Sequence, residues 1–507
     1  MKKIISFLIV LPLFFFASAQ QKKDSLYKER YRPQFHFSPA YNWTNDPNGL
    51  VYDHGKYHLF YQYNPYANVW GHMSWAHATS KDLVHWKHLP LAIPEDSAVM
   101  IFSGSCVVDE NNTSGFAKNP LQTPLVAVYT GHRIADKKNP DDYSQAQYLA
   151  YSTDDGNSWT KYENNPVLDI HKKDFRDPFV FWYEPEKKWV MLVVLPNKHV
   201  VQWYSSKNLK DWNHLSDFGP AGDTTAIWEC PSIARVPIEN GSGKTKWVLL
   251  NSQQISMQYF VGEFDGTTFV NENPPQKIYR PDHGPDYYAA VVYNHLPAKH
   301  SPILLGWANN WEYANDIPDS PWKSAMALPR QLSLEKIGNE WILKQKPLTA
   351  LRSSRKESWE GKTISVRGIK LLPARGTQAE IELTWMPAEK SISGLHLAVG
   401  EKNPFVIGYD AKKQTLFIDR KGTGDTAFNK NFASLSHYEA RLRLKNKKVT
   451  LDIYFDNSII EIFAQDGACV MTAQIFPAKK SDGIALFSQN GTNVFEKINI
   501  WQIRSAW

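Results

Sequence analysis

Residues 46–61 read DPNGLVYDHGKYHLFY, and this pattern decides the fold because it returns twice more along the chain. It recurs as DPFVFWYEPEKKWVMLVV at 177–194 and as ECPSIARVPIENGSGKTKWVLL at 229–250. Each copy opens with an acidic residue and a proline close behind it, and continues with two apolar runs separated by a turn. Such a pattern is typical of two antiparallel strands. The sequence therefore predicts one β-hairpin that is built repeatedly.

Two looser copies of this unit begin near residues 102 and 286. A second marker alternates with the first, and it consists of a serine, a polar turn and a tryptophan at 80–86, 152–159 and 206–212. Each of these would form the turn at the outer edge of one unit. Successive four-stranded units of this kind are typical of a β-propeller. We expect an all-β fold with a five-bladed β-propeller as the catalytic domain over residues 30–347.

The character of the sequence changes after Pro347. A charged stretch at 351–357 is followed by alternating apolar and polar residues, as at 379–385 and 449–455. Alternation over this length favours a β-sandwich. We expect this C-terminal domain over residues 355–507. Because its histidines and acids are sparse, we expect it to serve packing or accessory binding.

The composition argues against several classes of function. The chain has 507 residues, with Lys+Arg 57 against Asp+Glu 51 and a net charge of +6. The basic residues form no run of the kind that binds nucleic acid or a membrane surface. Aromatic residues reach 13%, and their rings suit either the flat faces of sugars or a large β-rich core.

The N-terminus reads as a targeting segment. Two lysines precede an apolar stretch at 4–16, and Ala17-Ser18-Ala19 fits a cleavage site. Residues 1–19 are therefore predicted to be a secretory signal peptide. We expect a secreted protein, periplasmic or extracellular, that has no membrane span.

Two groups of potential ligand residues are interpreted as structural. The cysteines are too few for a disulfide framework, and we expect buried thiols, with one possible bridge between Cys106 and Cys230. The third cysteine is Cys469. Four histidines lie close together in sequence, but their spacing does not match a metal-binding pattern. They are His72, His77, His85 and His88, and no metal site is predicted.

The acids that open the hairpins are the candidate catalytic groups. The innermost strand of each propeller blade lines the central channel, so Asp46, Asp177 and Glu229 should surround one funnel. Carboxylates that face a glycosidic bond are the usual machinery of glycoside hydrolysis. We expect the neighbouring Arg176 to keep Asp177 ionised. We expect Glu229, in the most apolar setting, to be the proton donor and Asp46 the nucleophile.

An ordered set of motifs resembles glycoside hydrolase family 32, the family of invertases, inulinases and levanases. The motifs are WTNDPNG at 43–49, FSGS at 102–105, RDP at 176–178, WECP at 228–231, DHGPDYYA at 282–289 and DNSIIEIF at 456–463. The resemblance covers about residues 35 to 507. It implies a five-bladed propeller followed by a sandwich, a retaining mechanism through a fructosyl-enzyme, and no metal or cofactor.

Position by position, the resemblance implies roles for individual residues. Asp46 corresponds to the nucleophile, Glu229 to the acid/base, and Asp177 to the stabiliser of the transition state that grips fructose hydroxyls. The residues that would line the fructose pocket are Asn45, Gln62, Trp70, Phe102, Ser103, Arg176 and Trp307. The run WANNWEYA at 307–314 is most similar to the exo-acting inulinases and levanases.

The leading hypothesis is therefore an exo-acting β-fructosidase whose substrate partner is a fructan, such as levan or inulin, or sucrose. An endo-acting levanase or inulinase, or a fructosyltransferase, is the alternative within the family, because pocket and open cleft differ in loops such as 132–143. A non-catalytic fructan-binding protein is the alternative of another class, and the three intact carboxylates argue against it. An arabinan-cleaving propeller is conceivable from architecture alone. The sequence predicts no oligomeric state.

Overall fold

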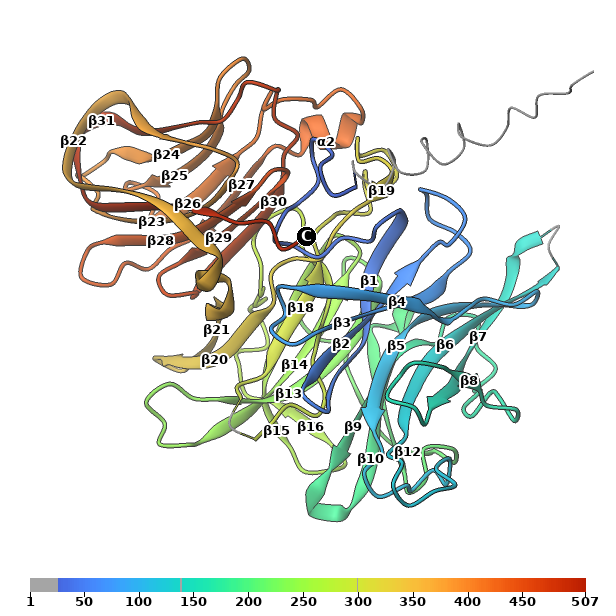
Figure 1. Cartoon of the computed structure of the whole chain (residues 1–507). Helices are drawn as coiled ribbons and strands as arrows, with labels where there is room; N and C mark the ends of the chain where they lie inside the picture. Colours follow the sequence, from blue (N-terminus) through green and yellow to red (C-terminus); the bar gives the residue numbers. More distant parts are fainter. Residues whose placement is uncertain (1–25, 137–138, 299) are drawn as a thin grey trace, which may run out of the picture.

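A computed structural model describes residues 26–136, 139–298 and 300–507. Figure 1 shows two β-rich domains, the first coloured blue through yellow and the second gold to red. The predicted fold class, an all-β five-bladed propeller followed by a β-sandwich, is confirmed. The predicted signal peptide lies outside the described residues.

Each blade is an antiparallel sheet of four strands, which are consecutive in blades 1 to 4, while in blade 5 a two-residue strand that pairs with blade 1 intervenes. Blade 1 contains β1 (Asn42–Asp53), β2 (Lys56–Tyr63), β3 (Ser74–Ser80) and β4 (Trp86–Ile93). Blade 2 contains β5 (Val99–Val108), β6 (Leu125–Asp136), β7 (Asn139–Ser152) and β8 (Thr160–Lys161). Blade 3 contains β9 (Arg176–Tyr183), β10 (Lys188–Leu195), β11 (Val200–Ser206) and β12 (Asn213–Phe218). Blade 4 contains β13 (Trp228–Pro237), β14 (Thr245–Gln253), β15 (Ser256–Phe264) and β16 (Phe269–Asn271). Blade 5 contains β17 (Tyr288–Val292), β18 (Ile303–Trp307), β20 (Arg330–Ile337) and β21 (Glu340–Pro347).

The serine of the second sequence marker ends the third strand in blades 1 to 3. Ser80 Oγ accepts a hydrogen bond from the backbone N–H of Leu83 at 2.8 Å, and Ser152 Oγ accepts one from Gly156 at 2.9 Å. A serine that bonds the backbone a few residues on favours a turn over a continued strand. The marker therefore forms the turn at the outer edge of a blade, as predicted.

The ring of blades is closed between blade 5 and blade 1. The inner strand β1 contacts both β5 and β17, so the first and last blades are neighbours. A short strand from blade 5, β19 (Trp322–Lys323), also pairs in parallel with the start of β1. Closure of this kind covers the sheet edges that an open array would expose.

The second domain is one continuous sheet that folds into two layers. Its long strands β22 (Arg355–Arg375) and β31 (Gly483–Ile503) pair with each other. The first part of β31 pairs with β24 and its last part with β23, so this strand joins the two layers. The other strands are β23 (Gln378–Met386), β24 (Ile392–Val399), β25 (Phe405–Asp410), β26 (Thr415–Asp419), β27 (His437–Arg441), β28 (Val449–Asp456), β29 (Ile459–Ala464) and β30 (Cys469–Gln474). Short helices occur at η1 (Glu184–Glu186), η2 (Pro196–Lys198), η3 (Thr349–Ser354) and α2 (Lys430–Ser434).

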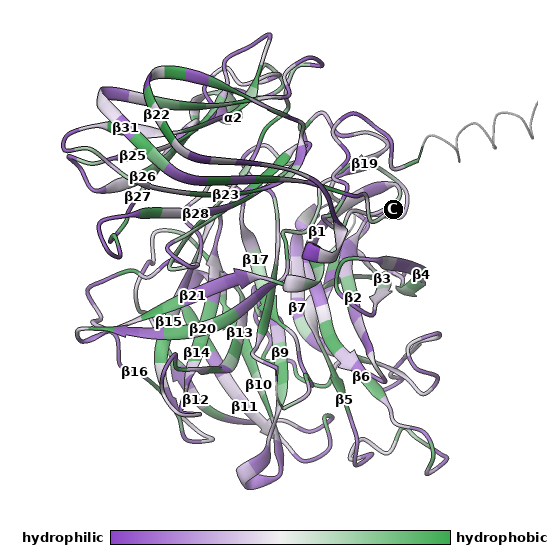
Figure 2. Cartoon of the chain, turned by 60° about the vertical axis from the view of Figure 1, so that its left-hand side comes forward, coloured by the Kyte–Doolittle hydropathy of each residue, from purple (hydrophilic) through white to green (hydrophobic). Residues whose placement is uncertain are grey.

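Much of the aromatic content serves the core. Figure 2 shows hydrophobic residues along the strands, with hydrophilic residues in the connecting loops and also along outer strands such as β20 and β22. The largest fully buried side chains include Trp43, Trp75, Trp203, Trp228, Trp307, Trp322 and Trp385. Six of these tryptophans lie in the propeller and Trp385 lies in the sandwich, and each buries more apolar area than an aliphatic side chain.

Buried ionic groups join the two domains. His36 Nδ1 lies 2.8 Å from the Asp456 carboxylate, and His36 Nε2 lies 3.0 Å from that of Glu461. Burial alone would lower the pKa of His36, but its hydrogen bonds to the two carboxylates raise it to about 9. Glu461 also pairs with Arg330 of blade 5, whose Nη1 lies 2.9 Å from Asp282. Charges that leave water need such complete pairing.

One propeller loop, residues 282–287, lies directly on the sandwich. Asp282 accepts hydrogen bonds from the backbone N–H and the hydroxyl of Thr472 in β30, at 3.0 and 2.7 Å. A Cβ on Gly284 would lie 2.1 Å from the Thr472 carbonyl oxygen, so only glycine permits this close approach. Asp286 pairs with Arg420 of the sandwich at 2.8 Å. This loop leads straight into β17.

Candidate active site

All five inner strands have a bulge at the same level of the propeller. Pairing with the second strand shifts between Thr44 and Pro47 in β1 and between Glu229 and Ser232 in β13. The strands β5, β9 and β17 have the same interruption. In three of them a proline follows the acid closely, and proline cannot donate to the ladder. Because a bulge redirects a side chain, the acids turn into the funnel.

Asp46 is buried, and both of its carboxylate oxygens have donors. Asn45 Nδ2 donates to Oδ1 at 3.0 Å, and the Ser103 hydroxyl of β5 donates to Oδ2 at 2.6 Å. Asn45 is itself oriented by Trp43, whose Nε1 donates to Asn45 Oδ1 at 2.8 Å. Burial raises the pKa of Asp46, while the hydrogen bond from Ser103 opposes this and the charge of Glu229 adds to it. Its donors fix the direction of the carboxylate.

Asp177 is linked to Asp46 through Cys230. The backbone N–H of Cys230 donates to Asp177 Oδ2 at 2.9 Å. The Cys230 thiol lies 3.5 Å from Asp46 Oδ2 and 3.6 Å from Asp177 Oδ2, so it separates the two carboxylates. Burial raises the pKa of Asp177 to about 7, although Arg176 acts in the opposite direction. All three cysteines of the chain are free and buried, so the possible Cys106–Cys230 bridge is not formed.

Glu229 is held by an arginine and a tyrosine. Arg176 Nε and Nη2 both bind Glu229 Oε1, at 3.0 and 2.9 Å. The Tyr288 hydroxyl, from the first residue of β17, donates to Oε2. Arg176 Nη1 also binds Asp174 at 3.0 Å. The guanidinium therefore joins Glu229 to blade 3 as a bidentate charge-assisted contact.

The two expectations about these charges meet different outcomes. Arg176 lowers the pKa of Asp177, as expected, but burial raises that pKa more, and the guanidinium pairs with Glu229 and Asp174. Glu229 is not in the most apolar setting, since it is half-buried whereas Asp46 and Asp177 are buried. Adjacent side chains of a strand point to opposite faces. Trp228 therefore enters the core while Glu229 faces the funnel, and the Cys230 thiol at the bulge lies against Asp46 and Asp177.

A cavity of about 500 Å³ lies over the three carboxylates. Most of the predicted site residues line it: Asn45, Asp46, Gln62, Trp70, Phe102, Ser103, Arg176, Asp177 and Glu229. They come from blades 1 to 4, so segments far apart in sequence meet at one point. Because the hairpin motif recurs in successive blades, the acidic residues that open the hairpins lie together in one cavity.

Trp307 is the predicted pocket residue that does not line this cavity. It is completely buried, and its Nε1 donates to the Ser324 hydroxyl. Its ring packs against Trp43 and Trp311, with ring centroids 6.1 and 4.8 Å away. Trp311 lines the cavity instead. Trp307 therefore supports the wall from behind.

Several residues that line the cavity were not predicted from the sequence. They are Met73, Met100, His132, Ile134, Tyr143, Gln145, Asp174 and Trp311. The hairpin of β6 and β7 supplies His132 and Tyr143, whose rings continue an aromatic wall that begins at Trp70. Phe102 stacks on His132 with centroids 4.4 Å apart, and His132 lies 4.6 Å from Tyr143. The only sequence signal for this wall was the unassigned segment 132–143.

The clustered histidines do not converge on one point. His72 pairs with Glu95, His77 with His58, His85 with Asp82, and His88 with Tyr27. Within the described residues, one group could bring three ligand atoms within reach of a cation: Asp53, His54 and Asp155. Asp53 and His54 lie at the turn between β1 and β2, Asp155 lies at the turn between β7 and β8, and two of the three side chains are exposed.

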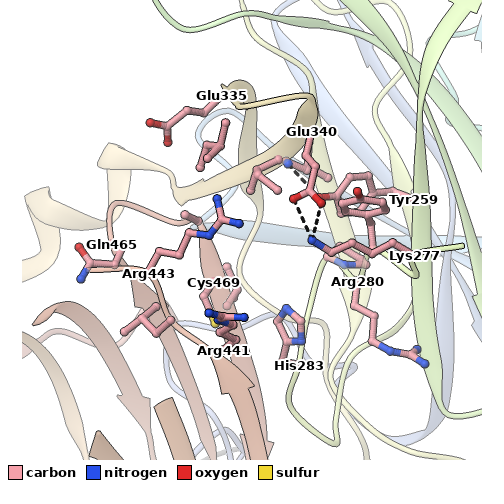
Figure 3. Close-up of a pocket in the computed structure, with 18 of the residues that line it drawn as sticks. Tyr259, Lys277, Arg280, His283, Glu335, Glu340, Arg441, Arg443, Gln465 and Cys469 are labelled. Atoms are coloured by element: carbon pink, nitrogen blue, oxygen red, sulfur yellow. Dashed lines mark hydrogen bonds and ion pairs between the residues drawn. The ribbon is translucent and has the colours of Figure 1, made fainter. Parts of the chain in front are cut away.

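A separate cavity of about 430 Å³ lies between blades 4 and 5 and the sandwich. Figure 3 shows its basic rim, with Arg441 and Arg443 on one side and Lys277 bound to Glu340 on the other. Its second acid, Glu335, is paired with Lys445 at 3.0 Å. Both carboxylates are thus neutralised by lysines. The funnel, where carboxylates outnumber their cation, is the site suited to acid/base chemistry.

Comparison with known proteins agrees with this geometry. The family model for the glycosyl hydrolases family 32 N-terminal domain matches residues 36–347, and that for the family 32 C-terminal domain matches residues 347–502. A levanase of Bacillus subtilis (strain 168) is 43% identical over 519 residues, which cover 99% of this chain and 75% of the levanase. An extracellular exo-inulinase of Aspergillus niger is 39% identical over 522 residues, which cover 95% of this chain and 96% of the inulinase.

A solved structure extends the similarity to three dimensions. The exo-inulinase of Aspergillus awamori has a TM-score of 0.88 and 38% sequence identity, and the match covers 95% of this chain and 100% of that one. Both domains therefore occur in the same order and arrangement. The chain belongs to glycoside hydrolase family 32 and is a glycoside hydrolase.

Proposed function

We propose that this chain is a retaining exo-β-fructosidase that releases terminal fructose from levan, inulin and sucrose. One observation carries the proposal: three inner strands each contribute a carboxylate to one cavity, and side chains of other blades orient these carboxylates. The identity of 39–43% to proteins named levanase and exo-inulinase supports fructans as the substrate class. The identity covers nearly the whole chain.

In the first step, Asp46 acts as the nucleophile. Its carboxylate oxygen bonds to the anomeric carbon of the terminal fructose as the bond to the leaving oxygen breaks, and Glu229 gives its proton to that oxygen. The donors Asn45 and Ser103 hold Asp46 in one orientation. Glu229 suits the proton transfer because it is the least buried of the three carboxyls, with both oxygens positioned by Arg176 and Tyr288.

In the second step, water completes the reaction. Glu229 takes a proton from water as the water oxygen bonds to the anomeric carbon, and the ester bond to Asp46 breaks. Asp177 holds fructose hydroxyls throughout. Burial and the neighbouring carboxylates raise the pKa of Asp177, which limits the negative charge beside Asp46.

A product time course on levan, inulin and sucrose tests the proposal. The purified chain is expected to release fructose as the first product from each, and Asp46→Asn is expected to lose at least about a thousandfold in kcat. Asp155→Asn is the matched control and should keep full activity, because Asp155 is an exposed aspartate at the turn between β7 and β8.

Each alternative activity has its own product pattern. A ladder of oligosaccharides from the first minutes would identify an endo-acting enzyme. Glucose released in excess of fructose from sucrose would identify a fructosyltransferase. Fructan binding without sugar release would identify a binding protein, and any of these results would overturn the proposal.

We also propose that the chain is secreted. The predicted signal peptide and the word extracellular in the name of the Aspergillus niger relative support this. Among the described residues, no helix is long and apolar enough to cross a membrane.

A further inference from the structure

The catalytic cavity opens into a second hollow on the rim of blades 1 and 2. This hollow has a volume of about 870 Å³ and shares Trp70, Met100, His132 and Ile134 with the catalytic cavity. Its remaining walls are the loop between β2 and β3 and the segment from Glu95 to Val99. We call it the blade-1 groove. A ligand that leaves the catalytic cavity past Trp70 enters this groove.

The blade-1 groove presents apolar surface to solvent. Within one loop, Tyr66 is 71% exposed, Val69 is 48% exposed and Trp70 is 42% exposed. Exposed apolar side chains that gather beside a catalytic cavity mark a binding surface more often than isolated ones do. Tyrosine and tryptophan rings offer flat apolar faces together with polar tips, a combination that matches a sugar ring.

The loop that carries these rings is held in place. Asn64 Nδ2 donates to the Val69 carbonyl at 2.8 Å, and Asn64 Oδ1 accepts from the backbone N–H of Tyr66 at 2.9 Å. The backbone N–H of Trp70 donates to Asn315 of blade 5 at 3.1 Å. A surface fixed before the ligand arrives loses less entropy on binding. The exposed rings therefore belong to a built surface.

The charges of the blade-1 groove favour a neutral ligand. Glu95 pairs with His72 at 2.6 Å, and Asp96 pairs with Lys161 at 3.0 Å. The Tyr66 ring also meets the edge of His72, with centroids 5.2 Å apart and planes at 88°. Each acid has its own basic partner, which leaves hydroxyl and carboxylate oxygens for hydrogen bonds to sugar hydroxyls.

We propose that the blade-1 groove binds the sugar residues of a fructan chain beyond the one next to the scissile bond, with Tyr66 as their stacking platform. This inference rests on the proposed function and adds to it a specificity-determining residue, Tyr66, which favours chains of three or more sugar units over sucrose. Sucrose has one sugar unit beyond the scissile bond, and that unit lies at the boundary formed by Trp70. Longer chains gain contacts that sucrose does not make.

The test compares two substrates in each variant. We expect Tyr66→Ala to lower the ratio of kcat/KM for an inulin-type tetrasaccharide to kcat/KM for sucrose by roughly threefold to tenfold, as loss of one aromatic contact requires. Tyr66→Phe keeps the ring and should keep the ratio. Leu121→Ala removes a side chain that is 93% exposed on the loop after β5, and is the control for loss of exposed apolar surface.

Distinct results separate this inference from the proposed function. If the ratio of the two kcat/KM values is unchanged in Tyr66→Ala, the proposal that the blade-1 groove binds fructan is overturned, even when the wild-type chain releases fructose normally. Equal losses on both substrates also overturn it, because Tyr66 would then act only by supporting the loop. Absence of hydrolysis by the wild-type chain overturns the proposed function itself. Thermal unfolding of each variant shows whether the fold is intact.

Discussion

Replacing Ser103 by alanine is expected to move the acid limb of the kcat/KM profile to higher pH. The Ser103 hydroxyl donates to Asp46 Oδ2 at 2.6 Å and lowers the pKa of a carboxyl that burial raises. A hydrogen bond donor stabilises the charged form, so its removal raises the pKa of Asp46 further. The nucleophile must be ionised, so activity then requires a higher pH.

The size of the shift follows from the strength of this hydrogen bond. A hydrogen bond to a charged group contributes about 1.5–3 kcal/mol, and one pKa unit corresponds to about 1.4 kcal/mol. These values set a range of about one to two pH units. Asn45 and the Cys230 thiol still contact the carboxylate in the variant. We therefore expect a shift of about one unit, at the lower end of the range.

The assay is sucrose hydrolysis at low substrate concentration across the acidic and neutral range, because kcat/KM reports the ionisation of the free enzyme. Ser105→Ala is the matched control, since Ser105 is also buried in β5 but accepts from the backbone N–H of Val180 at 2.8 Å. Its acid limb should coincide with that of the wild type. A lower plateau in Ser103→Ala with an unmoved acid limb would refute the reasoning, because Ser103 would then serve only substrate binding.

Two further predictions concern stability and thiol chemistry. Because the pKa of His36 is raised to about 9 from its usual 6.5, its protonation stabilises the fold by about 3 kcal/mol below pH 6.5, and this contribution is lost as pH rises through 9. The melting temperature of His36→Gln should therefore vary less between these pH values than that of the wild type, and an equal slope in both would contradict the interpretation. Burial raises the pKa of Cys106 and Cys230 well above 9 and that of Cys469 to about 12. Iodoacetamide at pH 8 should label these thiols only after unfolding, as mass spectrometry would show, and rapid labelling of the native chain would rule this out.

The propeller was predictable because its signals are local and repeated. The acid and proline that open a hairpin sit at the bulge of an inner strand, and the Ser-to-Trp marker forms the outer turn. Both features depend on a few adjacent residues, which propensity and turn chemistry describe well. The same repetition located the site, since equivalent positions in a propeller meet at its axis.

The electrostatics of the site could not be predicted from adjacent residues. Trp228 and Cys230 flank Glu229 in sequence, but Trp228 is buried in the core, the Cys230 thiol lies against Asp46 and Asp177, and Glu229 lines the cavity. The true partners of Glu229 are Arg176 of blade 3 and Tyr288 of blade 5. Contacts between residues so far apart in sequence depend on how the blades are arranged around the propeller axis, and no local sequence pattern predicts that arrangement.

The aromatic wall of the cavity could not be predicted from the sequence for a similar reason. His132 enters the cavity only because the β6–β7 hairpin lies over Phe102, with the two rings 4.4 Å apart and nearly parallel. Trp307 and Trp311 are the same residue type four positions apart, and the sequence offers no means to decide which one is exposed to the cavity. The structure places the first in the core and the second in the wall.

The loop at 282–288 connects the sandwich to the reacting groups. Asp286 pairs with Arg420 of the sandwich at 2.8 Å, and Asp282 accepts a hydrogen bond from Thr472 of the sandwich at 2.7 Å while Arg330 of blade 5 is its ion-pair partner. Two residues after Asp286, Tyr288 donates its hydroxyl to Glu229. Buried carboxylates that lost these partners would carry unpaired charge in the interior, which strongly destabilises a fold. The sandwich therefore contributes to the position of Glu229 without touching the cavity, and its packing role is part of how the active site is built.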